Sequence, residues 1–465
     1  MFESLGGFDR RYMPAYYEDT DLAFAVRSVG LRVVYEPRAR VLHVEGASAG
    51  TDTTRGMKAF QVTNQGVFAE KWRTELQAHP APGLDLDAAS TWRTTPTVLI
   101  VDGETPHPDV DSGSVRLVNI MRLLREEGAH VVFWPIDRRY DGRATELLQS
   151  LGVETFYAPS AASLAGFLRE RGLRIDTVMA CRYHVAREVL PLVRKHAPSA
   201  RLVFDTVDLH YVRESRQAEL ENDATLRRLA GHTRRLELDV VTRSDATLVV
   251  STAEVGLLSN ESPQAHLAVL SNVHEISGRG ADYSSRAGLV FVGGFRHLPN
   301  VDAVRWFVTD IFPLIQEQIP EVRFHCIGAG VPPEIAELAE TDGVEIHGHV
   351  ADLDPFMDTV RVSVAPLRFG AGVKGKINMS LAHGQPVVAT RLAVEGMHLT
   401  DDWDVLVADG PAEFAACVVR LYNDRVLWER LAENGLSNVE AHFSMEVARD
   451  VVRRELLGIT PSKHV

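Results

Sequence analysis

Two lysines in a glycine-rich turn are the sequence feature with the clearest chemistry. Lys374 and Lys376 stand in the stretch 370–390, "GAGVKGKINMSLAHGQPVVAT". A short helix-like run, expected over 378–383, follows the turn, and a Gly-x-Pro step then leads into an apolar strand. The free N–H groups at the start of a helix and the two ammonium groups would all attract a phosphate. The stretch therefore predicts an anion site, and it contains no acidic residue.

Further glycines and arginines could complete this anion site. Gly293 and Gly294 follow the apolar run "LVFV", and glycine lets the backbone come close to a ligand. Gly372 belongs to the lysine-bearing turn, and Arg296 and Arg368 are additional cations that could face a phosphate. A tight turn is the alternative interpretation of the glycine pair, and a solvated loop is the alternative for the lysines.

A second polar cluster follows another strand-like run, in "VFDTVDLHYVRESRQAEL". Asp205, Asp208 and His210 come directly after the apolar residues, where ligand sites of α/β proteins lie. His210 could hydrogen-bond a substrate or steer its hydroxyl group. A structural network between the aspartates and the arginines that follow is the main alternative. A metal site is a weaker one, because the spacing DxxDxH on one loop is not a known ligand set.

Strand-like and helix-like patterns alternate over most of the chain. In the first series the apolar runs 97–102 and 130–135 flank a helical pattern over 115–128. A second series begins near residue 288, after a break near 275–287. This alternation predicts two parallel sheets, each covered by helices on both faces. Both polar clusters would then lie at carboxyl ends of strands, facing a site between twin domains.

The composition is that of an ordinary soluble protein. The 465 residues are enough for two or three domains, and 45% of them are apolar. A net charge of −14 argues against a nucleic-acid partner. Three scattered cysteines indicate neither a disulfide framework nor a zinc cluster, and no run of about 18 apolar residues predicts a membrane span. Because the first residues also lack the features of a signal peptide, we expect a cytoplasmic protein.

The motifs of the second series resemble the donor half of family-4 GT-B glycosyltransferases. They are "FVGGFRHLPNVDAVRWF", "IGAGVPPEI", "VEIHGHVADLDPFM", "VSVAPLRFGAGVKGKINMSLAHGQPVVAT" and "AVEGMHL", in this order. The resemblance covers about 95–460. It implies an α/β protein of the GT-B fold, with two Rossmann-like domains facing across a cleft. These would be an acceptor domain over 96–280, a nucleotide-sugar donor domain over 281–440, and C-terminal helices over 441–465 that could cross back.

The resemblance implies transfer of a sugar from a nucleoside-diphosphate sugar to a glycan or glycolipid, with retention and without a metal cofactor. Lys376 matches the family's diphosphate lysine better than Lys374 does. The family usually carries two glutamates eight residues apart, but Met379 stands at the second position and the first falls near Arg368. Glu395 is the nearest downstream carboxylate, and could contact the ribose or the sugar. Its alternative role is to stabilise a helix N-terminus.

The same resemblance assigns an acceptor side to the first series. Ser112, Gly113 and Ser114 lead into a helix in the manner of the family's first loop. This turn could bind an anion, and an N-cap formed by Ser112 or Ser114 is compatible with that role. Asp208 lies on the same side, and His210 would contact the transferred sugar or the acceptor hydroxyl. A lipid-linked acceptor would bring the protein to the inner face of the membrane as a peripheral protein.

Residues 1–80 resemble the last third of family-2 GT-A glycosyltransferases, through "YYEDTDLAFAVRSVGLRVVYEPRARVLHVEGAS". The resemblance implies that Asp19, second in a Glu-Asp pair, deprotonates the acceptor, and that His43 ligates a nucleotide-bound Mg or Mn ion. The family's nucleotide-binding half and DxD motif precede this block and are absent from the sequence. We therefore expect a truncated remnant, inactive alone and with a partly exposed core, joined by a linker over 81–95.

Two interpretations compete with an active transferase. The missing glutamates and the truncated front favour a catalytically silent protein that binds sugar nucleotides or acts as a scaffold. A Rossmann oxidoreductase or a GT-B epimerase is a weaker alternative, because no GxGxxG motif opens either series.

Overall fold

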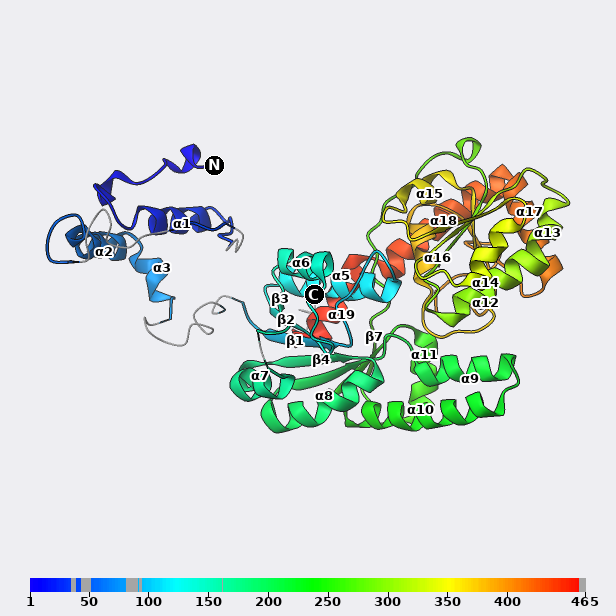
Figure 1. The fold of residues 1–465 in the computed structure, drawn as a ribbon, viewed down its shortest axis with the longest axis horizontal. Coiled ribbons are helices and arrows are strands. Elements are labelled where there is room, and N and C mark those ends of the chain that lie inside the picture. Colours follow the sequence, from blue (N-terminus) through cyan, green and yellow to red (C-terminus); the bar gives the residue numbers. More distant parts are fainter. Residues whose placement is uncertain (35–38, 43–51, 81–90, 92–93, 161, 460–465) are drawn as a thin grey trace, which may run out of the picture. The chain divides into compact units, whose positions relative to one another are not determined.

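The computed structural model describes residues 1–34, 39–42, 52–80, 91, 94–160 and 162–459, and it divides the chain into two compact units. The units are Met1–Arg93 and Thr94–Val465, and each is described on its own. Figure 1 shows the elements of both. Among the described residues, no helix has the length and apolar character needed to cross a bilayer.

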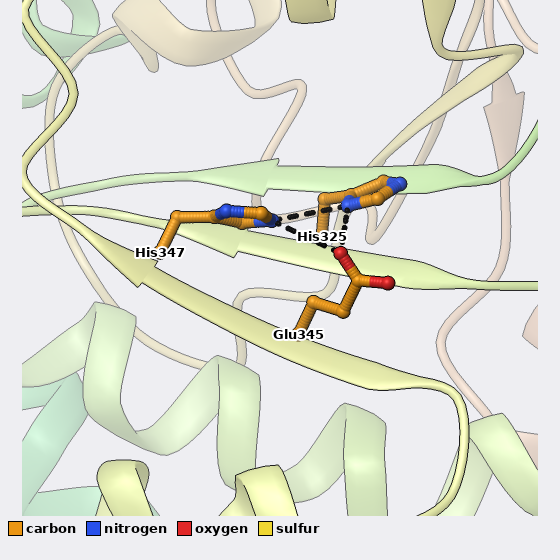
Figure 2. Close-up of side chains that lie close together, drawn as sticks. All are labelled: His325, Glu345 and His347. Atoms are coloured by element: carbon orange, nitrogen blue, oxygen red, sulfur yellow. Dashed lines mark hydrogen bonds and ion pairs between the residues drawn. The ribbon is translucent and has the colours of Figure 1, made fainter.

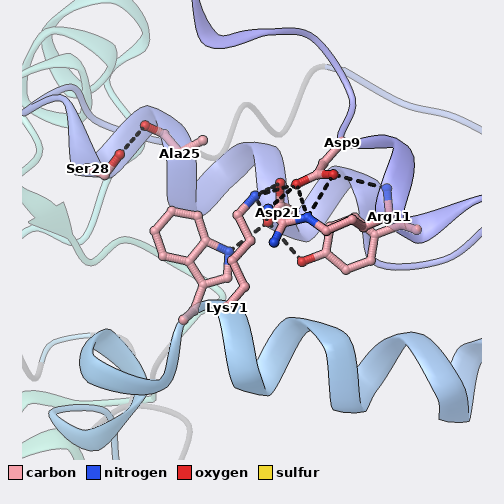
Figure 3. Close-up of polar contacts among 8 residues, drawn as sticks. Asp9, Arg11, Asp21, Ala25, Ser28 and Lys71 are labelled. Carbon is pink, nitrogen blue, oxygen red and sulfur yellow. Dashed lines mark hydrogen bonds and ion pairs between the residues drawn. The ribbon is translucent and has the colours of Figure 1, made fainter.

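The smaller unit is built around a buried carboxylate. Its helices are α1 Glu18–Ser28, α2 Ala59–Lys71 and α3 Arg73–Gln77. Asp21 accepts hydrogen bonds from Tyr12 Oη at 2.9 Å and Trp72 Nε1 at 2.7 Å, and Lys71 Nζ pairs with it (Figure 3). The apolar core beside this network consists of Tyr12, Phe68 and Trp72 with a few partly buried neighbours.

Much apolar surface of the smaller unit faces solvent. The exposed large apolar side chains include Leu31, Val33, Val34, Val41 and Leu42. Side chains of this kind ordinarily lie in a core or an interface. In the described part of this unit these side chains lie outside the small buried core of Tyr12, Phe68 and Trp72.

The first sheet of the larger unit has seven parallel strands, in the order β3-β2-β1-β4-β5-β6-β7. The strands are β1 Thr97–Asp102, β2 His130–Pro135, β3 Glu154–Thr155, β4 Thr177–Cys181, β5 Arg201–Asp205, β6 Ala246–Val249 and β7 Leu267–Val269. The connecting helices are α5 Ser112–Glu126, α6 Gly142–Ser150, α7 Leu164–Arg171, α8 Tyr183–His196, α9 His210–Leu220, α10 Ala224–Arg243 and α11 Thr252–Glu261. Along β1, Val98 and Ile100 join the core on one face, while Leu99 and Val101 join the core on the other. Burial on both faces explains why the strand is a continuous apolar run.

The second sheet has six parallel strands, in the order β10-β9-β8-β11-β12-β13. The strands are β8 Leu289–Val292, β9 Phe324–Ile327, β10 Val344–Gly348, β11 Val362–Ala365, β12 Val387–Ala389 and β13 Leu406–Val407. The helices are α12 Leu298–Trp306, α13 Phe312–Gln316, α14 Pro333–Ala336, α15 Asp354–Thr359, α16 Gly375–Ala382 and α17 Pro411–Asn423. The largest apolar cluster among the described residues packs on this sheet and includes Phe291, Phe324 and Trp428. The fold prediction of two parallel, helix-covered sheets is confirmed.

The last two helices belong to different domains. Helix α18, Arg425–Phe443, packs against α16 and α17 of the second domain, and α19, Met445–Glu455, packs against α5 of the first (Figure 1). Val452 and Leu456 enter the core of the first sheet, and Arg449 pairs with Glu127 at 2.8 Å. The chain thus passes between the domains twice.

Candidate active site at the junction of the two sheets

The start of helix α16 carries both lysines of the glycine-rich turn. The helix begins at Gly375, so the expected start near residue 378 is wrong by about one turn, and Asn378 is fully buried inside the helix. Lys374 is the residue before the helix, and Lys376 lies in its first turn. The two ammonium groups thus flank a helix N-terminus, whose unpaired N–H groups already favour an anion.

Gly293 and Lys376 approach each other at the end of strand β8. A methyl group on Gly293 would come within 2.8 Å of Lys376 Nζ and 2.7 Å of Asn300 Nδ2, so a larger residue here would displace these side chains. Lys376 Nζ donates to Asn300 Oδ1, and Asn300 Nδ2 donates to the Gly294 carbonyl oxygen at 2.7 Å. Sequence reasoning missed Asn300, although its place a few residues after the glycine pair was a signal. The glycine pair and Lys376 therefore form one cluster.

The acceptor-side turn lies against the same helix start. A methyl group on Gly375 would come within 2.3 Å of Ser112 Cβ, which means that α5 and α16 bring their N-termini together. Asp111 caps α5, accepting from Ser114 N at 2.9 Å and from Ser114 Oγ at 2.7 Å, so neither candidate serine is the cap. Two helix N-termini and two lysines thus converge, which concentrates positive potential at one point.

Both lysines have lowered pKa values in the protein without ligand. Burial, with Arg216 nearby, lowers the pKa of Lys374 to about 8. Burial, with Lys374 nearby, lowers the pKa of Lys376 to about 7. Lys374 Nζ donates to the carbonyl oxygens of Ala371 and Gly372, so this lysine supports its own turn from within. A bound anion would stabilise the charged form of both lysines.

The second polar cluster faces the turn from the first sheet. Gly372 has φ of +69°, and a methyl group on it would come within 3.1 Å of Asp208 Cβ. Asp208 pairs with Arg213. Burial raises the pKa of Asp208, but Arg213, His210 and His297 together outweigh it and hold the pKa below its ordinary value. His210 Nδ1 lies 3.2 Å from the Asp208 carbonyl oxygen, and burial lowers the pKa of the imidazole. His210 is thus neutral near pH 7, and when Nδ1 donates to Asp208 its Nε2 is an acceptor.

Two buried glutamates fix the backbone of this cluster. Glu237 accepts from the N–H groups of His210 and Tyr211 at 3.2 and 3.1 Å, and Glu254 accepts from Leu209 N at 3.4 Å. Burial raises the pKa of Glu237 to about 8 and that of Glu254 to about 7. Sequence reasoning missed both glutamates. Glu237 shares the buried stripe of α10, and a charged residue at apolar helical spacing was the available signal.

The backbone at residue 207 is strained. Val207, just before Asp208, has φ of +62°, a region that a β-branched residue rarely adopts. Strain of this type costs about 1–3 kcal/mol and persists where surrounding contacts impose it. The two glutamates hold the backbone that follows, at residues 209–211. Asp205 is not part of the site, because Arg116 binds both of its oxygens in the interior at 2.6 and 2.9 Å.

Glu395 and Arg216 join the two domains beside this cluster. Arg216 binds Glu395 at 2.7 Å and donates to the Gly370 carbonyl oxygen at 2.8 Å. Both side chains line an open pocket of about 550 Å³, together with Arg391, Leu392, Val394 and Asp409. Glu395 is thus a partly exposed carboxylate at a pocket next to the lysine-bearing turn.

The remaining predicted residues lie in different surroundings. Arg296 is exposed, and its side chain forms no hydrogen bond or ion pair with any residue that the structure describes. Arg368 is held by Asp302 of α12 and lies over the Trp306 ring at 5.4 Å, so it is already paired. Met379 packs against an apolar cluster beside β8.

The candidate residues of the smaller unit are not assembled into a site by the described part of the chain. Asp19 is exposed in the first turn of α1 and accepts from Thr20 N at 2.6 Å. His43 lies outside the described residues.

Comparison with known proteins finds one family match and several structural matches. Residues 286–424 match the family model described as "Glycosyl transferases group 1". Among solved structures, sucrose-phosphate synthase from Thermosynechococcus elongatus matches with a TM-score of 0.60 and 13% identity, covering 78% of this chain and 100% of that one. Anabaena HepE in complex with UDP and glucose has a TM-score of 0.60 and 14% identity over the same shares. A Rickettsia africae glycosyltransferase has a TM-score of 0.53 and 12% identity, over 77% and 98%.

These structural matches show that the two Rossmann-like domains have the fold of GT-B transferases. The match of residues 286–424 to a glycosyltransferase family model and the fold both agree with the predicted class of enzyme. One curated relative, the uncharacterised protein y4gI of Sinorhizobium fredii, is 30% identical over 89 residues, or 19% of this chain. The chain spans about a tenth of the length of that relative.

Proposed function

We propose that the larger unit is a family-4 GT-B enzyme that transfers a sugar, with retention, from a nucleoside-diphosphate sugar to a glycan or lipid-linked glycan. One observation carries the proposal: the N-termini of α5 and α16 meet at Ser112 and Gly375, with Lys374 and Lys376 beside them. A departing diphosphate develops negative charge, and donors and cations fixed in advance stabilise it most effectively. HepE, which shares the fold, has been crystallised with UDP-glucose, so UDP-sugars are the first donors to test.

The two sheets face each other at a junction with two walls. The first-sheet wall carries Asp208 and His210, and the second-sheet wall carries Lys374 and Lys376. The proposed reaction assigns a role to each wall. The bond between the anomeric carbon and the diphosphate oxygen breaks, and the electron pair leaves with the diphosphate toward Lys376. The acceptor oxygen bonds to the same face of the sugar, and its proton passes to the departing phosphate. His210, held in place by Asp208 and Glu237, would orient a hydroxyl through Nε2. Because lysines and helix N-termini supply the positive charge, this mechanism requires no metal cofactor.

The proposal extends to the smaller unit and to the location of the reaction. We propose that residues 1–80 are the C-terminal part of a family-2 GT-A transferase, in which Asp19 and His43 would act, with Mg or Mn, only in a completed domain. The buried Asp21 network gives the described part of this unit a fixed structure without such a site. We place the reaction in the cytoplasm, at the inner face of the membrane when the acceptor is lipid-linked.

A silent sugar-nucleotide-binding protein is the second candidate, and Met379 favours it. The Met379 side chain packs against an apolar cluster. The family that this sequence resembles usually has a glutamate at the same position. Glu395 is paired with Arg216, so a contact from Glu395 to the sugar or ribose would have to compete with this ion pair or share it. Such a protein would bind the donor without transferring the sugar.

A thermal-shift panel with UDP, GDP, TDP and their sugars tests the proposal. A ligand at 100 times its Kd stabilises a protein by about 2.7 kcal/mol, and the melting temperature should rise for the matching nucleotide. Lys376→Ala should lose the shift, whereas Lys195→Ala, which removes an exposed lysine of α8, should keep it. No shift with any nucleotide would exclude both candidates. A shift without release of the nucleotide from its sugar, with any acceptor, would favour the silent binder.

A further inference from the structure

Three side chains on neighbouring strands of the second sheet point their ligand atoms at one another. They are His325 of β9 and Glu345 and His347 of β10 (Figure 2). His325 Nδ1 lies 3.1 Å from His347 Nε2 and 3.3 Å from Glu345 Oε2. His347 Nε2 lies 3.6 Å from the same carboxylate oxygen. The three atoms thus form a nearly equilateral triangle.

The triangle has the dimensions of one face of a zinc coordination tetrahedron. Zinc binds imidazole nitrogen at about 2.0–2.1 Å and carboxylate oxygen at about 2.0–2.2 Å, in tetrahedral geometry. Ligand atoms at these distances stand about 3.3–3.6 Å from one another. The observed separations of 3.1, 3.3 and 3.6 Å therefore need only small side-chain adjustments to accept the ion. Imidazole is a ligand type that suits zinc, and Asp or Glu oxygen also binds zinc in proteins.

The sheet itself places the three residues together. Glu345 is the register partner of His325 on the adjacent parallel strand, and His347 follows two positions later on the same face. The register shifts between Ile346 and Gly348, an irregularity of the kind that re-aims a side chain. Phe356 of α15 packs against both imidazole rings, at 5.8 and 5.1 Å. The ligand atoms are thus held by backbone pairing and by packing.

The surroundings leave one carboxylate oxygen free for an ion. Arg323 donates to Glu345 Oε1 at 3.0 Å, while Oε2 faces the two histidines. A carboxylate whose second oxygen accepts a hydrogen bond from a neighbouring side chain is typical of metal ligands, because such bonds fix the orientation of the ligand. The three side chains are partly exposed, which gives an ion a path from solvent. In an ordinary row of ion pairs, each ligand atom would contact only its neighbour. Here each of the three ligand atoms lies within 3.6 Å of both others.

We propose that His325, Glu345 and His347 bind one Zn²⁺ ion, with water at the fourth position. The site is formed by the β9–β10 edge of the second sheet and uses none of the residues that we assign to sugar transfer. The ion would tie the edge strand β10 to β9 through side chains in addition to the backbone hydrogen bonds. This inference does not depend on the proposed transferase reaction.

Titration of the chelator-treated full chain with ZnCl₂, followed by calorimetry, tests the site. We expect one zinc ion per chain that the variants His325→Gln and His347→Gln weaken by at least about 100-fold, because losing an outer partner alone costs about 10–100-fold. The control His349→Gln should bind zinc like the original protein, since His349 pairs with Asp109 instead. Equal binding by the original protein and both variants, or no zinc binding, would overturn the proposal.

A second test measures amide hydrogen exchange in the unmodified protein with and without zinc. This test needs no variant, so its result does not depend on whether a variant folds. Zinc should slow exchange of the amides in 324–327 and 344–348 relative to the metal-free protein. The exchange rates of the β12 amides should not change, because β12 lies near the opposite edge of the sheet. Zinc binding with no protection at β9 and β10 would place the ion elsewhere and contradict the proposal.

Discussion

The two walls of the interdomain junction handle charge in opposite ways. On the first-sheet wall the acidic side chains of the cluster already have partners: Asp208 pairs with Arg213, and Glu237 accepts two backbone N–H groups. On the second-sheet wall, Lys374 and Lys376 are buried with lowered pKa values and face no acidic partner in their own turn. The first wall therefore holds a fixed shape, while the second holds charge that an anionic ligand would complete.

The largest expected effect comes from the fixed wall. His210→Gln should lower kcat by about 10²–10⁴-fold, the usual contribution of a positioned acid-base or orienting group. Nucleotide affinity should stay unchanged, because the lysines lie on the other wall. The measurement is nucleotide release from the best donor of the thermal-shift panel, with His232→Gln on the exposed face of α10 as the control. An equally large loss of nucleotide affinity would contradict the assignment of nucleotide binding to the second-sheet wall alone.

The contact between the walls should give the next largest effect. Gly375→Ala places a methyl group 2.3 Å from Ser112 Cβ, and overpacking of this kind costs about 1–3 kcal/mol. Nucleotide affinity should fall by about 5–150-fold, the equivalent of that energy. Ser112→Gly removes the opposing atoms and should restore most of the affinity in the double variant, as measured by calorimetry. If Ser112→Gly does not rescue binding, the two helix starts do not meet in solution.

The smallest effect should come from the protonation of the charged wall. Lys376 has a pKa of about 7 without ligand, and an anion raises it, so binding takes up a proton. Affinity should therefore fall as the pH rises above about 7, by at most about tenfold per pH unit. Calorimetry in two buffers with different ionisation heats measures the uptake. The slope should be smaller for Lys376→Met, and proton release on binding would contradict this account.

The sequence alone predicts the strands and the lysine-bearing turn well, because both follow from local patterns. The run 97–102 is β1 to the residue, since burial on both faces requires continuous apolar side chains. The pattern predicts the start of α16 too late, because Gly375 is typical of a turn, and its contact with Ser112 is not visible in the local sequence. The motif places Arg368 in the donor site, but only the fold shows that Asp302 binds it. Contacts of this kind join residues far apart in the chain, and no local pattern encodes them.

The second crossing of the chain also limits how the domains can move. The linker after β7 and the segment between α18 and α19 run side by side, joined by a bridge between His274 and Ser444 and by a hydrogen bond of 2.8 Å from His274 N to the Phe443 carbonyl oxygen. Both passages therefore lie next to each other, at one hinge between the domains. A rotation of one domain about this hinge leaves both passages unbroken. Opening of the junction would separate the paired helix starts while the hinge itself stays nearly still.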